Sequence, residues 1–175
     1  HPTLRTYYAR MYEAKFLAGI IAGSMTTTNK IGYIADYPIY GMAANINAFA
    51  MGARMVNPHA KVYLDWSTLK DHAAKIKDDP EINYIMGQDI SSPDKASRHF
   101  GLYCVSGENP DNLAMTTWHW GKLYEKIIRI VLNGTWKDDA AAGSRATSYW
   151  WGISAGVVDL ICSQDLPKDT KRLVD

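Results

Sequence analysis

The chain has 175 residues, of which 47% are hydrophobic and 21% charged, a profile typical of a folded globular protein. Its 19 basic and 18 acidic residues give a formal charge of +1 without a basic run, which disfavours a nucleic-acid binder because phosphate contacts need a basic surface. The longest apolar stretch, residues 16–23, is far too short to cross a membrane.

Helical and strand-like patterns alternate along the chain. In chain order, the patterns predict a helix over residues 10–25, a strand over 30–35, a helix over 40–55, a strand over 61–66, a helix over 69–77, a strand over 82–86, a short helix over 93–99, strands over 101–105 and 113–117, a helix over 121–132, and short edge strands over 149–151 and 157–161. Gly19 and Gly23, inside the first helix, predict close packing of another element. The alternation indicates an α/β fold with a parallel sheet flanked by helices.

Polar and aromatic residues follow several of the predicted strands. The carboxyl ends of parallel strands share one edge of the sheet, and ligands of such sheets bind in the crevice beyond that edge. Tryptophan rings can stack on a flat ligand there, while carboxylates and amides bind its polar edges. The candidate ligand-binding residues are therefore Asp36, Tyr37, Trp66, Gln88, Asp89, Ser91, Trp118, His119 and Trp120.

The sequence lacks the common catalytic and cofactor motifs. It has no phosphate-binding glycine loop, no G-x-S-x-G and no H-E-x-x-H, and its five histidines are scattered. Cys104 and Cys162 are isolated, without a histidine at zinc-ligand spacing, and two buried thiols are a simpler expectation than a disulfide. We therefore expect a protein that is not an enzyme and that carries neither a metal nor a cofactor.

Several blocks of sequence carry a family likeness. They are Tyr-Glu-Ala-Lys-Phe-Leu-Ala-Gly-Ile-Ile-Ala-Gly at 12–23, Lys-Ile-Gly-Tyr-Ile-Ala-Asp-Tyr-Pro-Ile at 30–39, residues 45–53 with Val-Asn-Pro at 56–58, Gly-Gln-Asp at 87–89, His-Trp-Gly at 119–121, Val-Leu-Asn-Gly-Thr-Trp at 131–136 and residues 152–159. On these blocks the chain resembles the basic membrane protein family of substrate-binding lipoproteins that feed ABC transporters. That family includes the purine-nucleoside receptor of spirochaetes.

The resemblance implies a type I periplasmic-binding-protein fold, in which two α/β lobes close on a ligand. Family members are longer than this chain, so the chain is expected to be a fragment. Residues 1–29 would form the tail of the first lobe and the hinge, and residues 30–175 the second lobe. The resemblance also implies an extracytoplasmic location, a lipid anchor outside this fragment and ABC permease subunits as partners.

Known members of the family bind purine nucleosides or a free purine base between the lobes. By position, the family's ligand-facing segments match Asp36 and Tyr37, Gln88 and Asp89, and residues 118–120. Trp118 stands where a basic residue is common, and residues 105–109 lack the aspartate-rich pattern of the nucleoside receptors. These departures make a base, or another small heteroaromatic solute, as well supported as a nucleoside.

Two other functions remain open from the sequence. The same fold serves ligand-responsive sensors and regulators, since a fold does not determine a function. A purine-processing enzyme would need Asp36 and Asp89 to act as an acid–base pair across the crevice, although no nucleophile or metal site accompanies them.

Overall fold

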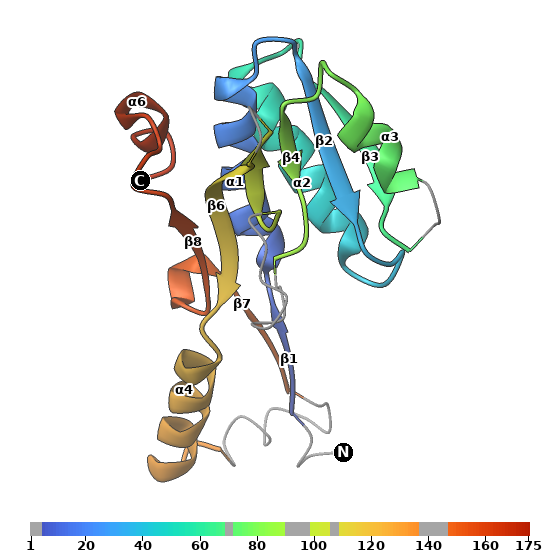
Figure 1. The fold of residues 1–175 in the computed structure, drawn as a ribbon. Helices are drawn as coiled ribbons and strands as arrows, with labels where there is room; N and C mark the ends of the chain where they lie inside the picture. The colour runs from blue at the N-terminus through green and yellow to red at the C-terminus, as the bar shows by residue number, and fades with distance from the viewer. Residues whose placement is uncertain (1–4, 69–71, 90–98, 106–108, 137–146) are drawn as a thin grey trace. The chain divides into compact units, whose positions relative to one another are not determined.

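The computed structural model describes residues 5–68, 72–89, 99–105, 109–136 and 147–175 (Figure 1). The elements are β1 (Arg5–Ala9), α1 (Met11–Met25), β2 (Lys30–Ala35), α2 (Met42–Val56), β3 (Lys61–Trp66), α3 (His72–Asp78), β4 (Tyr84–Met86), β5 (Leu102–Cys104), β6 (Asp111–Trp118), α4 (Trp120–Leu132), β7 (Thr147–Trp151), the short 3₁₀ helix η2 (Ile153–Ala155), β8 (Val158–Cys162) and α6 (Lys168–Lys171). No helix among these residues is long and apolar enough to span a bilayer.

The predicted helices and strands are confirmed wherever the structure describes them, with ends shifted by one or two residues. The predicted helix over 93–99 lies almost entirely outside the described residues, as do residues 69–71 at the start of another. The sequence patterns missed β1, η2 and α6. Periodicity therefore located the main elements but not these short ones.

The chain divides into two compact units, residues 1–11 with 118–159 and residues 12–117 with 160–175. Helix α1 contributes buried residues to the second unit's hydrophobic core. The sequence predicted a boundary between two lobes at residue 29. That boundary belongs to the longer two-lobe protein, so it stays a prediction.

A six-stranded sheet, in the order β3-β2-β4-β5-β6-β8, lies largely in the second unit. Strand β2 pairs in parallel with both β3 and β4, which confirms the α/β prediction. The sheet also contains one antiparallel strand, because β5 pairs antiparallel with β4 and β6. Backbone hydrogen bonds from Gly87 to Gly101 and from Gly101 to Gln88 extend this antiparallel pairing past the end of β4. Strand β6 runs parallel to β4, so β2, β3, β4 and β6 still end at one edge.

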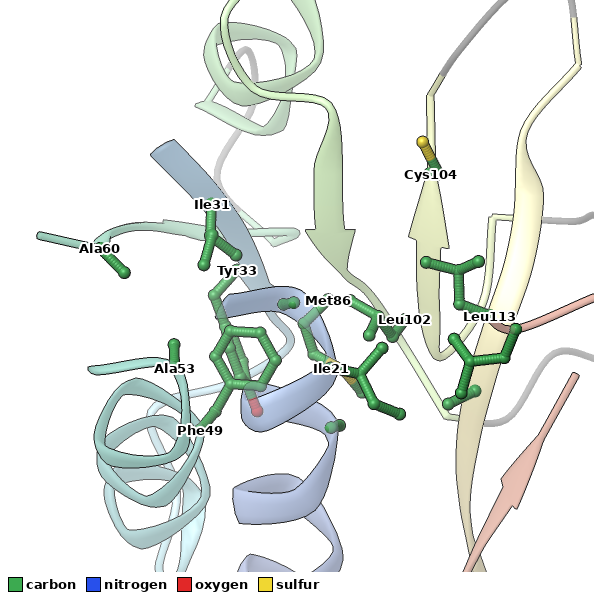
Figure 2. Close-up of a cluster of buried hydrophobic side chains, with 14 of the residues drawn as sticks. Ile21, Ile31, Tyr33, Phe49, Ala53, Ala60, Met86, Leu102, Cys104 and Leu113 are labelled. Carbon is green, nitrogen blue, oxygen red and sulfur yellow. The ribbon is translucent and has the colours of Figure 1, made fainter. Parts of the chain in front are cut away.

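Helices cover both faces of this sheet around β2. Alternate residues of a strand face opposite sides, and Ile31 and Tyr33 join a cluster with Phe49 of α2 and Ile21 of α1 (Figure 2). Ile34 faces the other cluster, which includes α3. Strand β2 is therefore buried on both faces, as expected for a central strand of an α/β layer.

Helices α1 and α2 pack with their backbones in contact. A Cβ atom on Gly19 would overlap the carbonyl group of Phe49, and one on Gly52 would overlap the carbonyl group of Phe16. Gly23 is equally crowded by Ala53. The packing role predicted for Gly19 and Gly23 is confirmed.

The first unit contains a separate two-stranded sheet, in which β1 and β7 pair in parallel from Arg5 opposite Thr147 to Ala9 opposite Trp151. Helix α4 follows β6 and buries Leu123, while Tyr124 and Ile128 remain exposed. Its apolar surface is thus only partly covered by the described residues.

Candidate functional site

Three side chains meet where β2, β3 and β4 end. Asp36 directly follows β2, Ser67 follows β3, and Gln88 lies two residues beyond β4. The Ser67 hydroxyl donates to Asp36 Oδ1 at 3.0 Å, and the Gln88 amide donates to the same oxygen. The expectation that strand ends bring Asp36 and Gln88 together is therefore met in the second unit.

Asp89 lies beside this group but turns toward the interior. Lys15 Nζ, from the first turns of α1, lies 2.7 Å from Asp89 Oδ1 and 2.6 Å from Oδ2. The hydroxyl of Thr116, on β6, donates to Oδ1 as well. The Lys15 side chain is 4% exposed and that of Asp89 12%, so this is a largely buried, hydrogen-bonded ion pair.

The surroundings of Lys15 and Tyr33 shift the pKa values of both side chains. Burial lowers the pKa of Lys15, and the carboxylate of Asp89 opposes that shift. Burial raises the pKa of the Tyr33 phenol, and the negative charges of Asp89 and Asp36 raise it further. Tyr33 is therefore a neutral hydroxyl at physiological pH.

A small hollow opens among these groups, with a volume of about 40 Å³. It is lined by Lys15, Tyr33, Ile34, Ala35, Asp36, Met42, Asn45, Gly87, Gln88 and Asp89. Asn45 Oδ1 is buried and has no hydrogen-bond partner in the described part of the chain. A volume of this size accommodates a few water molecules or one edge of a ligand, so these residues supply only part of a binding site.

The other predicted residues lie in different surroundings. Trp66 is half-buried and packs against the core, whereas Tyr37 is 59% exposed. Ser91 lies outside the described residues. Trp66 thus has a packing role in the structure, and the binding roles of Trp66, Tyr37 and Ser91 stay predictions.

The aromatic candidates belong to the first unit. The rings of Trp118 and Trp120 are nearly parallel, 11° apart in plane with their centroids at 6.2 Å, and Trp120 meets the edge of Tyr7. His119 Nε2 lies 3.2 Å from Asp159 Oδ2. The rings of Trp118 and Trp120 therefore lie side by side. Their gathering with Asp36 and Asp89 around one hollow stays a prediction.

Sequence reasoning missed Lys15, Thr116 and Asn45. The sequence pattern could have identified Lys15, because it lies four residues after Met11 and three before Ala18, within the apolar stripe of its helix. A charged residue in such a stripe needs a buried partner. Thr116 had no signal, because threonine is common in strands.

A larger cavity lies at the opposite edge of the sheet, with a volume of about 550 Å³. Its lining residues are Met25, Tyr84, Phe100, Cys104, Asp111, Asn112, Leu113 and Asp165. Tyr84 begins β4 and Asp111 begins β6, so this cavity is not at the carboxyl edge where α/β sheets bind ligands. Among the described residues, no group of three or more histidine, cysteine or acidic side chains could hold a metal ion.

Comparisons with solved structures find other proteins that share this α/β fold. The chain superposes on a transcriptional activator of the comK gene from Bacillus halodurans with a TM-score of 0.65 at 16% identity, covering 97% of this chain and 61% of that one. It superposes on an ABC transporter solute-binding protein from Conexibacter woesei with a TM-score of 0.62 at 13% identity, covering 98% and 60%. At these identities the similarity concerns the fold alone.

Sequence comparisons give more specific matches. Residues 3–79 match the Bmp family, described as ABC transporter substrate-binding protein PnrA-like. The chain is 27% identical to a purine-binding protein of Brucella abortus, over 98% of this chain and 51% of that protein. It is 30% identical to TsgA13 of Haloferax volcanii, by its name an ABC transporter glucose-binding protein, over 86% of this chain and 40% of that protein.

These matches confirm the resemblance drawn from the sequence. The similarity to the Bmp family, of the PnrA-like ABC transporter substrate-binding type, covers residues 3–79. The chain spans about half the length of the purine-binding relative and less of the other. The two relatives are named for different ligands, so the family does not by itself define the solute.

Proposed function

We propose that this chain provides one side of the solute-binding cleft of an ABC importer's substrate-binding protein. The observation that carries the proposal is the meeting of Asp36, Ser67 and Gln88 at the carboxyl edge of the second unit's sheet. Parallel α/β sheets bind ligands at this edge. The protein would capture a solute and release it to permease subunits without making or breaking a bond.

The proposed solute is a purine base or purine nucleoside. The purine-binding relative supports this choice, and the parallel rings of Trp118 and Trp120 offer faces suited to stacking. The hollow beside Asp36 is smaller than a purine, which agrees with a site completed by residues from elsewhere in the protein.

The proposal includes a two-lobe organisation, with residues 1–29 as the tail of the first lobe and the hinge, and residues 30–175 as the second lobe. The compact units have their boundaries at residues 11, 118 and 159, which makes these positions additional candidate hinges. Proteins of this class work outside the cytoplasm, and a lipid anchor elsewhere in the polypeptide would hold this one near its permease. A structure of the full-length protein with bound solute would test the lobe assignment.

Titration calorimetry of the full-length protein tests the function. We expect heat of binding for at least one of adenine, guanine, adenosine, guanosine and inosine, and a higher melting temperature with that compound, because a ligand of the native state stabilises it. Binding of glucose alone would replace the purine assignment by a sugar.

The same samples test the enzyme alternative. Release of free base from inosine would favour a purine-processing enzyme. The matched control is Asp169→Asn, which removes one negative charge from an exposed residue of α6 and should leave affinity unchanged. Failure of all the purines to bind would refute the purine assignment.

A further inference from the structure

The carboxylates of Asp36 and Asp89 differ in how many hydrogen bonds their oxygens already accept from the protein. Asp89 receives Lys15 on both oxygens and Thr116 on one. These partners come from α1 and β6, so the ion pair joins both elements to the segment that follows β4. With its charge balanced and its oxygens occupied, Asp89 has little capacity left for a ligand.

Asp36 is arranged in the opposite way. Both side-chain donors that reach it, Ser67 and Gln88, bind the same oxygen, Oδ1. Within the described part of the chain, no hydrogen-bond donor reaches Oδ2, and Asp36 is only half-buried. A carboxylate oxygen can accept two hydrogen bonds, so Oδ2 is ready to accept from a ligand.

A second acceptor lies in the same hollow. Asn45 Oδ1, from the first turns of α2, is buried without a partner and lines the hollow with Asp36. A buried polar atom without a hydrogen bond is costly, and a donor from the ligand would remove that cost. Asp36 and Asn45 therefore present acceptors, while the charge of Lys15 is balanced by Asp89.

We propose that Asp36, together with Asn45, selects solutes that present N–H or O–H groups to this side of the cleft. Asp89 is a positioning residue, which Lys15 and Thr116 hold against the protein interior. The proposal rests on the proposed function and narrows its ligand class to neutral or positively charged solutes with donor groups, such as aminopurines or nucleosides. Anionic solutes such as urate are disfavoured by the unbalanced charge of Asp36.

The test compares substitutions in the full-length protein by calorimetry with adenine, guanine, adenosine, guanosine and urate. Asp36→Asn can keep the acceptor at Oδ1 and replaces the acceptor at Oδ2 with an amide donor. We expect this variant to bind the best purine ligand at least about tenfold more weakly. We also expect a smaller ratio between its affinities for that ligand and for urate. A variant that merely destabilised the fold would weaken all ligands alike.

The charge control is Asp169→Asn, which removes one negative charge from an exposed residue outside the hollow. We expect its affinity for the best ligand to stay within about threefold of the unaltered protein. Equal affinity in Asp36→Asn and the unaltered protein would overturn the inference and leave the proposed function standing. An unaltered protein that binds none of the purines would overturn both the inference and the purine assignment.

Discussion

Replacing Lys15 with methionine should destabilise the second unit by leaving the Asp89 carboxylate buried without its partner. Breaking a buried ion pair in this way costs about 3–5 kcal/mol. The Asp89 side chain retains 12% exposure, and water can reach part of it, so we expect the lower end, about 3 kcal/mol. For a chain of this size that corresponds to a fall in melting temperature of roughly 6–12 °C.

Urea unfolding of the chain, followed by circular dichroism, measures this loss. The matched control is Lys30→Met, because Lys30 forms its ion pairs with Asp79 and Glu81 at a more exposed position, and its loss should be much smaller. Adding Asp89→Leu to Lys15→Met should restore most of the stability, because no buried charge is then left alone. A loss below about 1 kcal/mol for Lys15→Met would show that the pair behaves as a surface pair and would refute the reasoning.

Three further predictions concern packing, pH and stacking. Gly52→Ala should cost about 1–3 kcal/mol in urea unfolding, because its Cβ would force α1 and α2 apart; an unchanged midpoint would refute that contact. Burial raises the pKa of Tyr103 to about 12 from an ordinary value near 10. The protonated phenol therefore contributes its full stabilisation of the folded state below pH 10, and this stabilisation is lost as pH rises toward 12. Between pH 9 and 11 the free energy of unfolding of Tyr103→Phe should therefore fall by about 1.4 kcal/mol less than that of the unaltered protein. Identical pH profiles of unfolding free energy for the two proteins would contradict this. Trp118→Ala or Trp120→Ala in the full-length protein should weaken purine binding by about 1–3 kcal/mol in calorimetry, and unchanged affinity in both would exclude them from the site.

Sequence alone determined the local features of this protein. Helical and strand periods are properties of neighbouring residues, so the main helices and strands from α1 to β8 could be predicted within a residue or two of their described ends. The small residues Gly19 and Gly23 indicated where helices pack closely. The rule that parallel strands end at one edge predicted that Asp36 and Gln88 lie close together, as their hydrogen bond shows.

Only the tertiary structure decided how the polar groups divide their roles. Asp89 meets Lys15 from 74 residues away and Thr116 from 27 residues away, and no periodic pattern encodes such pairings. The reversal of β5 was equally invisible, because a short apolar strand has the same pattern in either direction. The physical reason is that a buried charge must find its partner in three dimensions, and packing of the whole unit, rather than the sequence around the charge, selects that partner.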